Sequence, residues 1–294
     1  DAAAHRPPYP ARPSRRPWAG SGLRLADVRH GMGQTRRMAQ ASVSLGVAGT
    51  LGAEAISRIA AATEASGFHA LWVNDTPGGD ALAGLAAAAE ATDSLVLASG
   101  VLPLDRRSPV EIARTVRQLR LPVGRLVLGV GSGGARAGAL ALVRDGVAAL
   151  RETGAGIMVG ALGPRMRRLA AEASGGPLLS WLTPEAASAQ ASAARAVSSG
   201  AHVALYVRTA FDPAARQRLD LECARYARVP AYRANLERLG IAASDTVIAP
   251  ASPAALLDRH RAAVDEVVLR AIPVGDGIGD YLRFVEQAAD RVAA

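Results

Sequence analysis

The residues best suited to chemistry in this sequence lie directly after short apolar segments. One run, Gly129 to Gly134, reads GVGSGG and follows such a segment. Glycines at these positions let the main chain approach a ligand closely or adopt positive φ angles. Gly129, Gly131 and Gly134 have the G-x-G-x-x-G spacing of a dinucleotide-binding loop, whereas a P-loop is excluded because the sequence contains no lysine. The run therefore indicates a ligand-binding loop and leaves its ligand undetermined.

Two further segments join an apolar stretch to the start of a predicted helix. They are residues 162–164 (LGP) and residues 182–185 (LTPE). Unpaired N–H groups and the helix dipole at such starts favour a bound phosphate. Ordinary capping explains the same residues equally well, since Thr183 before Pro184 is by itself a good helix start. Both interpretations stay open at this point.

Few side chains are suited to act as a general acid or base. Asp75 follows the apolar segment ALWVN, where it can bond a ring or a substrate, but a buried acid that caps the next helix would have the same sequence context. His69 and His202 precede apolar segments, which places both at the opposite end of the strands. Asp75 is therefore the catalytic candidate, and no general acid or base is assigned.

The body of the chain alternates short apolar segments with helical ones. Residues 246–252 fit either a strand or a loop, and residues 213–239 read as an inserted pair of helices. Apolar strands separated by single helices indicate a parallel sheet covered on both faces. About eight such units favour an α/β fold of the (β/α)8 TIM barrel type over an open doubly wound sheet, with the ligand site at the C-terminal ends of the strands. Strands are predicted over 42–47, 70–75, 95–102, 125–131, 157–162, 177–182, 202–208 and 266–272.

Composition and charge limit the possible classes of function. The chain has 294 residues and is 50% hydrophobic, and its single cysteine, Cys223, suits a cytoplasmic protein without disulfides. No apolar run approaches the roughly 20 residues that cross a bilayer. The net charge of +8 is concentrated in residues 1–37, which hold eight arginines and two acids. We therefore expect a disordered basic extension over residues 1–40 and one barrel domain over residues 41–294, with no specific nucleic-acid partner and no membrane.

The sequence resembles the luciferase-like monooxygenase family in five segments. These are GFHALWVND, SGVLPLDRRSPVEIA, GRLVLGVGSGG, VGALGPRM and SWLTPE, and they occur in the order and spacing of that family over about three quarters of the body. Within the family, the combination of ALGPRM and WLTPE is most similar to the actinobacterial branch of oxidoreductases that depend on coenzyme F420. The resemblance implies this deazaflavin coenzyme, with the flavin FMN as the alternative.

The resemblance also implies which residues bind the coenzyme. Gly100-Val101 matches a strand-end bulge, often with a cis peptide bond, that supports the back of the ring, and residues 131–133 match the loop beside the ring and ribityl chain. Residues 161–163 match the main chain near the ribityl phosphate, and Thr183 matches a phosphate donor. The implied set contains no metal ligand and consists of Asp75, Ser99, Gly100, Val101, Gly131, Ser132, Gly133, Ala161, Leu162, Gly163, Trp181 and Thr183.

One departure from the family pattern bears on the reaction. Dehydrogenases of this group have Asp-His after the second strand, whereas this chain has Asp75-Thr76. The implied reaction is hydride transfer between C5 of the deazaflavin and an unidentified small organic substrate. An FMN-dependent luciferase-like monooxygenase and a non-catalytic flavin-binding paralogue are the alternatives. The family commonly forms dimers through outer helices, so a homodimer is expected.

Overall fold

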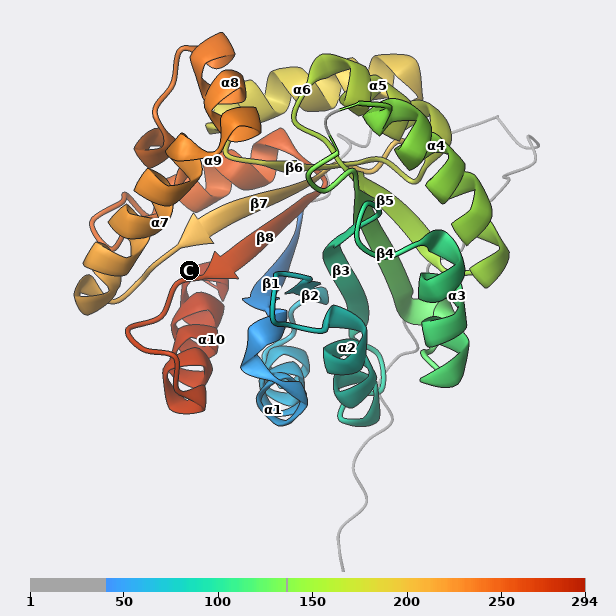
Figure 1. Ribbon diagram of the computed structural model, residues 1–294. Coiled ribbons are helices and arrows are strands. Elements are labelled where there is room, and N and C mark those ends of the chain that lie inside the picture. Colours follow the sequence, from blue (N-terminus) through green and yellow to red (C-terminus); the bar gives the residue numbers. More distant parts are fainter. Residues whose placement is uncertain (1–40, 136, 294) are drawn as a thin grey trace, which may run out of the picture.

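The strands of this chain form one closed parallel barrel. The computed structural model describes residues 41–135 and 137–293, and the predicted disordered extension over residues 1–40 lies outside the described residues. Neighbouring strands pair in sequence order, and β8 closes on β1 (Figure 1). The predicted TIM barrel is confirmed, and the open sheet that a dinucleotide-binding loop would need is excluded. The strands are β1 (Ser42–Ala48), β2 (Ala70–Asn74), β3 (Val96–Pro103), β4 (Leu126–Gly131), β5 (Gly156–Gly160), β6 (Pro177–Ser180), β7 (Ala204–Thr209) and β8 (Glu266–Ala271).

Helices surround the barrel and cover the outer face of its sheet (Figure 1). They alternate with the strands along the chain, as the sequence pattern predicts. Among the described residues, no helix combines the length and the apolar character that crossing a bilayer requires. The helices are α1 (Ala53–Ala65), α2 (Ala81–Glu90), α3 (Pro109–Gln118), α4 (Ala139–Leu150), α5 (Pro164–Ala173), α6 (Pro184–Val197), α7 (Arg216–Arg228), α8 (Pro230–Leu239), α9 (Ala255–Ala263) and α10 (Ile278–Ala293).

The connection between β7 and β8 contains the inserted helical pair. The segment predicted as two helices over residues 213–239 forms α7 and α8, and this prediction is confirmed. Residues 246–252 form a loop, which settles the ambiguity in that segment. The loop makes one parallel bridge, between Ile248 and Thr209 of β7. Pro250 and Pro253 lack the N–H groups that a longer ladder would need, so the segment adds no strand to the barrel.

A buried polar cluster fills the barrel at the N-terminal ends of the strands. The carboxylate of Glu266 accepts bonds from Ser44 Oγ at 2.5 Å and Trp72 Nε1 at 2.7 Å, and lies 3.1 Å from His202 Nε2. Burial alone would raise the pKa of Glu266, but the bond and charge of His202 and the bond from Ser44 outweigh burial and hold this pKa below its usual value. His202 therefore lies at the N-terminal ends of the strands, as predicted.

Candidate functional site

A bulge at the end of β3 lies at the centre of the C-terminal mouth. The Gly100-Val101 peptide is cis, and the pairing of β3 with β4 shifts register between Gly100 and Leu102. Both features were implied by the family resemblance and are confirmed. The Val101 side chain projects between the ends of β4 and β5, where a Cβ on Gly131 or on Gly160 would come within 2.9 Å of its methyl groups. The two glycines therefore make the space that Val101 occupies.

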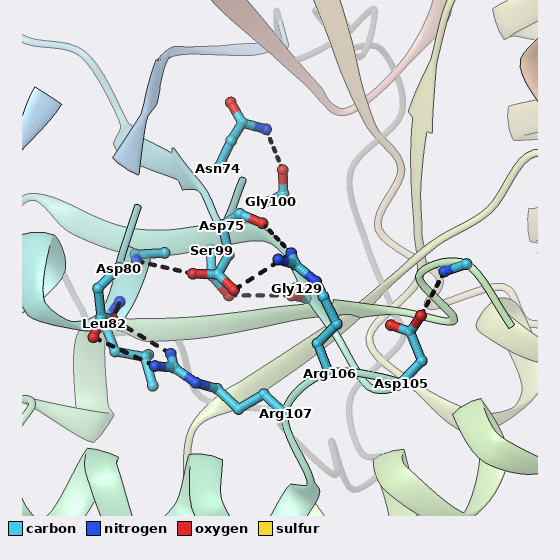
Figure 2. Close-up of polar contacts among 12 residues, drawn as sticks. Asn74, Asp75, Asp80, Leu82, Ser99, Gly100, Asp105, Arg106, Arg107 and Gly129 are labelled. Carbon is cyan, nitrogen blue, oxygen red and sulfur yellow. Dashed lines mark hydrogen bonds and ion pairs between the residues drawn. The ribbon is translucent and has the colours of Figure 1, made fainter. Parts of the chain in front are cut away.

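Polar atoms without partners lie beneath this bulge. The Asn74 side-chain amide donates to the carbonyl oxygen of Gly100, as Figure 2 shows. Asn74 Oδ1 and Tyr206 Oη are buried and have no hydrogen-bond partner among the described residues. The Tyr206 hydroxyl lies where a side chain on Gly100 would have to go. Burial raises the pKa of Tyr206, so its hydroxyl stays protonated and can donate one hydrogen bond.

An aspartate that sequence reasoning missed holds the glycine loop after β4. Asp105 Oδ2 accepts from the main-chain N–H of Gly134 at 2.7 Å. Gly133 has a φ of +59°, and a Cβ there would collide with the Asp105 carboxylate. The predicted loop of Gly131, Ser132 and Gly133 is therefore fixed from one side by Asp105. No local pattern links Asp105 to this loop, because the contact spans about 30 residues of sequence.

The contacts of Asp75 are those of a capping acid. Its Oδ1 accepts from the N–H of Ala81, the first residue of α2, at 3.1 Å (Figure 2). Arg106 donates to the Asp75 carbonyl oxygen at 2.9 Å and lies 4.0 Å from its carboxylate. Arg107 pairs with Asp80 at 3.3 Å. Both arginines are therefore engaged by acids at this edge of the mouth.

The start of α5 is open and positively charged. Its N-cap, Gly163, has no side chain to accept a bond from the first turn, and a Cβ built there would meet no atom within 4 Å. Arg167 Nη1 and Arg238 Nη2 donate to the Leu162 carbonyl oxygen at 2.5 and 3.2 Å. Neither arginine pairs with an acid in the part of the chain that the structure describes. Burial lowers the pKa of Arg167, and the charge of Arg238 lowers it further.

The start of α6 differs from the start of α5, although both follow a strand and begin with proline. Thr183 Oγ1 accepts from the N–H of Ala186 at 3.3 Å, so the threonine caps its own helix. The phosphate role implied for Thr183 stays a prediction, and its contacts match the ordinary capping that the sequence left open. Ala161, directly after β5, is buried, Leu162 beside it is half-buried, and the N–H of Ala161 donates to the carbonyl oxygen of Leu178 at 3.1 Å.

A buried arginine separates the mouth from the inserted helices. The guanidinium of Arg208 in β7 lies 4.2 Å from the ring of Trp181 and 4.7 Å from that of Tyr226 in α7. Arg208 also donates to Ser180 Oγ at 2.5 Å. Trp181 has a φ of 58° and is 1% exposed. The predicted ligand residue Trp181 thus packs beneath α7, and its contact with Arg208 is one that sequence reasoning missed.

A cavity of about 400 Å³ opens at the other side of the mouth, at the ends of β8 and β1. Arg270 of β8, Arg218 and Glu222 of α7, and Tyr281 of α10 contribute to its wall. None of the residues implied for coenzyme binding lines it. Because β8 and β1 lie across the barrel from β4 and β5, the cavity and the glycine-bearing strand ends are two separate parts of one rim. Within the described residues, no group of three or more histidines, cysteines and acids has a metal-binding arrangement.

Comparisons with known proteins agree with this architecture. The model of the luciferase-like monooxygenase family matches residues 35–142. None of the curated proteins compared with the chain matches it in sequence. Among solved structures, an F420-dependent secondary alcohol dehydrogenase in complex with an F420-acetone adduct is 14% identical, with a TM-score of 0.66, and covers 86% of this chain and 99% of that chain.

Two further structures have the same barrel. The coenzyme F420-dependent tetrahydromethanopterin reductase from Methanopyrus kandleri is 15% identical, with a TM-score of 0.65, and covers 85% of this chain and 98% of that chain. The oxygenating constituent of 3,6-diketocamphane monooxygenase from Pseudomonas putida, in complex with FMN, is 14% identical, with a TM-score of 0.59, and covers 85% of this chain and 98% of that chain. At these identities the structural likeness is evidence for the fold alone.

Proposed function

We propose that this chain is a luciferase-like oxidoreductase that binds a phosphate-bearing deazaflavin or flavin at the C-terminal mouth of its barrel. The family match over residues 35–142 supports the general class. We further propose that the coenzyme is F420, on the resemblance of residues 161–166 and 181–185 to enzymes that use it. The substrate is a small organic molecule.

The open start of α5 is the observation that carries this proposal. An uncapped helix start presents main-chain N–H groups and the positive end of the helix dipole. Arg167 and Arg238 add two cations whose donors converge on the Leu162 carbonyl, with no acid to balance them among the described residues. Space for a ligand group exists beside Gly163. A phosphate satisfies all of these groups at once, since it is an anion with several acceptor oxygens.

The residues around the β3 bulge fit a flat ring. Val101 offers an apolar surface, held in place by the glycine contacts at the ends of β4 and β5. Asn74 Oδ1 and Tyr206 Oη offer a buried acceptor and a buried donor that lack protein partners. Unpaired buried polar atoms are costly, but neither atom is accessible in this structure, so a ring would bond them only after the bulge above them shifts. These groups, with the loop at residues 131–133, would hold and orient the ring.

When bound, a deazaflavin of this kind supplies hydride transfer at its C5 atom, and the protein supplies position and environment. Tyr206 keeps its proton and acts as a hydrogen-bond donor, because burial disfavours its anion. Asp75 is engaged with the start of α2 and with Arg106. We therefore assign no general acid or base, and propose that orientation of the reactants is the main contribution of this chain.

Titration with coenzymes tests the proposal. Purified protein is titrated with coenzyme F420, FMN and riboflavin, and binding is followed by quenching of coenzyme fluorescence. We expect F420 to bind more tightly than FMN, and riboflavin to bind at least about tenfold more weakly than FMN because it lacks the phosphate. Tighter binding of FMN, with oxygen uptake by the reduced complex, would replace F420 by the FMN-dependent monooxygenase. Binding of F420 without turnover of any carbonyl substrate would favour the non-catalytic paralogue, and failure of all three to bind would reject the proposed function.

A further inference from the structure

Two arginines lie side by side where β7 and β8 reach the mouth. Arg208 and Arg270 are register partners in these parallel strands, so their side chains leave the same face of the sheet, with Cα atoms about 5 Å apart. Arg208 is 5% exposed and packs between aromatic rings, whereas Arg270 lines the 400 Å³ cavity. Like charges directly opposite each other on a sheet are destabilising unless a counter-charge is present. A nearby anion would therefore stabilise this pair.

The acids around this pair also form ion pairs with other arginines. Glu222 lies 4.0 Å from Arg208 Nε but only 2.8 Å from Arg225. Asp276, at the cavity wall, pairs with Arg218. Arg270 donates to the Ala271 carbonyl at 2.7 Å and has no carboxylate within 4.0 Å among the residues that the structure describes. An excess of positive charge therefore remains at Arg208 and Arg270, and the cavity gives access to Arg270 alone.

The rest of the cavity wall has a mixed character. Leu51, Ile272 and Pro273 form an apolar part, and the charged part is formed by the arginines and acids named above. Burial raises the pKa of Tyr281, whereas the charge and hydrogen bond of Arg270 beside it lower that pKa. Arg270 bonds the Ala271 carbonyl and Tyr281 but no carboxylate of the described residues, and it lies next to the apolar part of the wall, so it fits a carboxylate that it can bind through two parallel hydrogen bonds.

We propose that this cavity selects small organic acids as substrates, with the carboxylate on Arg270, an apolar body along Leu51 and Ile272, and the far end reaching across the mouth toward the ring site. The role of the acid as a substrate rests on the proposed function, whereas the binding of an acid to the cavity does not depend on the coenzyme. Failure of coenzyme binding and failure of acid binding are therefore separate results.

The test uses the full chain without coenzyme and measures binding by isothermal titration calorimetry. The probes are benzoate, trans-cinnamate and hexanoate, each compared with its neutral primary amide. We expect at least one acid to bind at least about tenfold more tightly than its amide, since the amide loses the charge-assisted bonds. Equal affinity of every acid and its amide, or no binding of any acid up to about 10 mM, overturns the proposal.

Variants locate the binding group. Arg270→Met is expected to lose the preference for the acid, and Arg270→Lys to retain part of it, because lysine keeps the charge but not the fork of donors. Arg283→Met is the matched control, since it removes the same charge from an exposed arginine of α10. An Arg283→Met variant that loses acid binding as fully as Arg270→Met would show non-specific attraction and overturn the assignment. If Arg270→Met does not fold, the comparison of acid with amide on the wild-type chain still decides the question.

Discussion

Replacing Gly163 with aspartate should stabilise the protein and weaken coenzyme binding. Gly163 has φ −83° and ψ 156°, an extended conformation that aspartate adopts readily, and its Cβ position is open. Aspartate is a preferred N-cap, worth a few tenths of a kcal/mol over glycine, and its charge near the helix dipole adds a similar amount. With Arg167 and Arg238 close by, we expect a gain of about 1 kcal/mol, or roughly 2 °C in Tm for a chain of this size.

The same substitution should act in the opposite direction on binding. The new carboxylate would accept the first-turn N–H groups and face the two arginines, which are the groups we assign to the phosphate. Each charge-assisted hydrogen bond contributes about 1.5–3 kcal/mol, so the loss of two of them costs about 3 kcal/mol or more. This corresponds to an affinity at least roughly a hundredfold lower for F420 or FMN. Affinity for riboflavin, which carries no phosphate, should change little.

The assay pairs thermal unfolding with fluorescence titration on three proteins. Gly163→Asn supplies a neutral cap and should lower coenzyme affinity less than Gly163→Asp does. Thr183→Asp introduces the same charge at the start of α6, where Thr183 already caps the helix, and should leave affinity nearly unchanged. A full loss of binding in Thr183→Asp, with normal binding in Gly163→Asp, would place the phosphate at α6 and refute this reasoning.

Three further outcomes follow from the structure. Gly160→Ala brings a Cβ within 2.9 Å of Val101 and should cost about 1–3 kcal/mol of stability and weaken coenzyme binding. Gly124→Ala, whose Cβ meets no atom within 4 Å, is the control and should change neither. Equal effects of the two variants on Tm and affinity would contradict this. Burial lowers the pKa of His260 to about 4, so between pH 6.5 and 4 this histidine binds a proton in the unfolded chain but not in the folded chain. Tm should therefore fall over this range more steeply in wild type than in His260→Leu. Burial raises the pKa of the Cys223 thiol to about 11, so Ellman's reagent at pH 8 should label it only after unfolding, and rapid labelling of the folded chain would disprove its burial.

The barrel was predictable because its evidence is local and repeated. Each apolar run of strand length is followed by a helical pattern, and the count of these units distinguishes a closed barrel from an open sheet. The exception, residues 246–252, is apolar enough for a strand but meets only one neighbour, Thr209. Local composition cannot report how many neighbours a segment will have, so this ambiguity needed the structure.

The candidate site was predictable only in part, for the same reason. The resemblance implied the Gly100-Val101 bulge, and the structure has it. From the sequence, the helix starts at Gly163 and Thr183 were equally good candidates for phosphate binding. Only three-dimensional contacts distinguish them, because Thr183 caps its own helix, whereas Gly163 lies beside an arginine from the distant α8. The arginines in strands 202–208 and 266–272 interrupt otherwise apolar runs, and that interruption was a usable signal of a charged site.

A crystal structure of the protein with coenzyme F420 tests the central claim most directly. We predict the coenzyme phosphate at the start of α5, within hydrogen-bonding distance of the first-turn N–H groups and of Arg167, with the ring packed against Val101. A ring seated in the cavity at the ends of β8 and β1, or a phosphate bound elsewhere on the rim, would contradict the account.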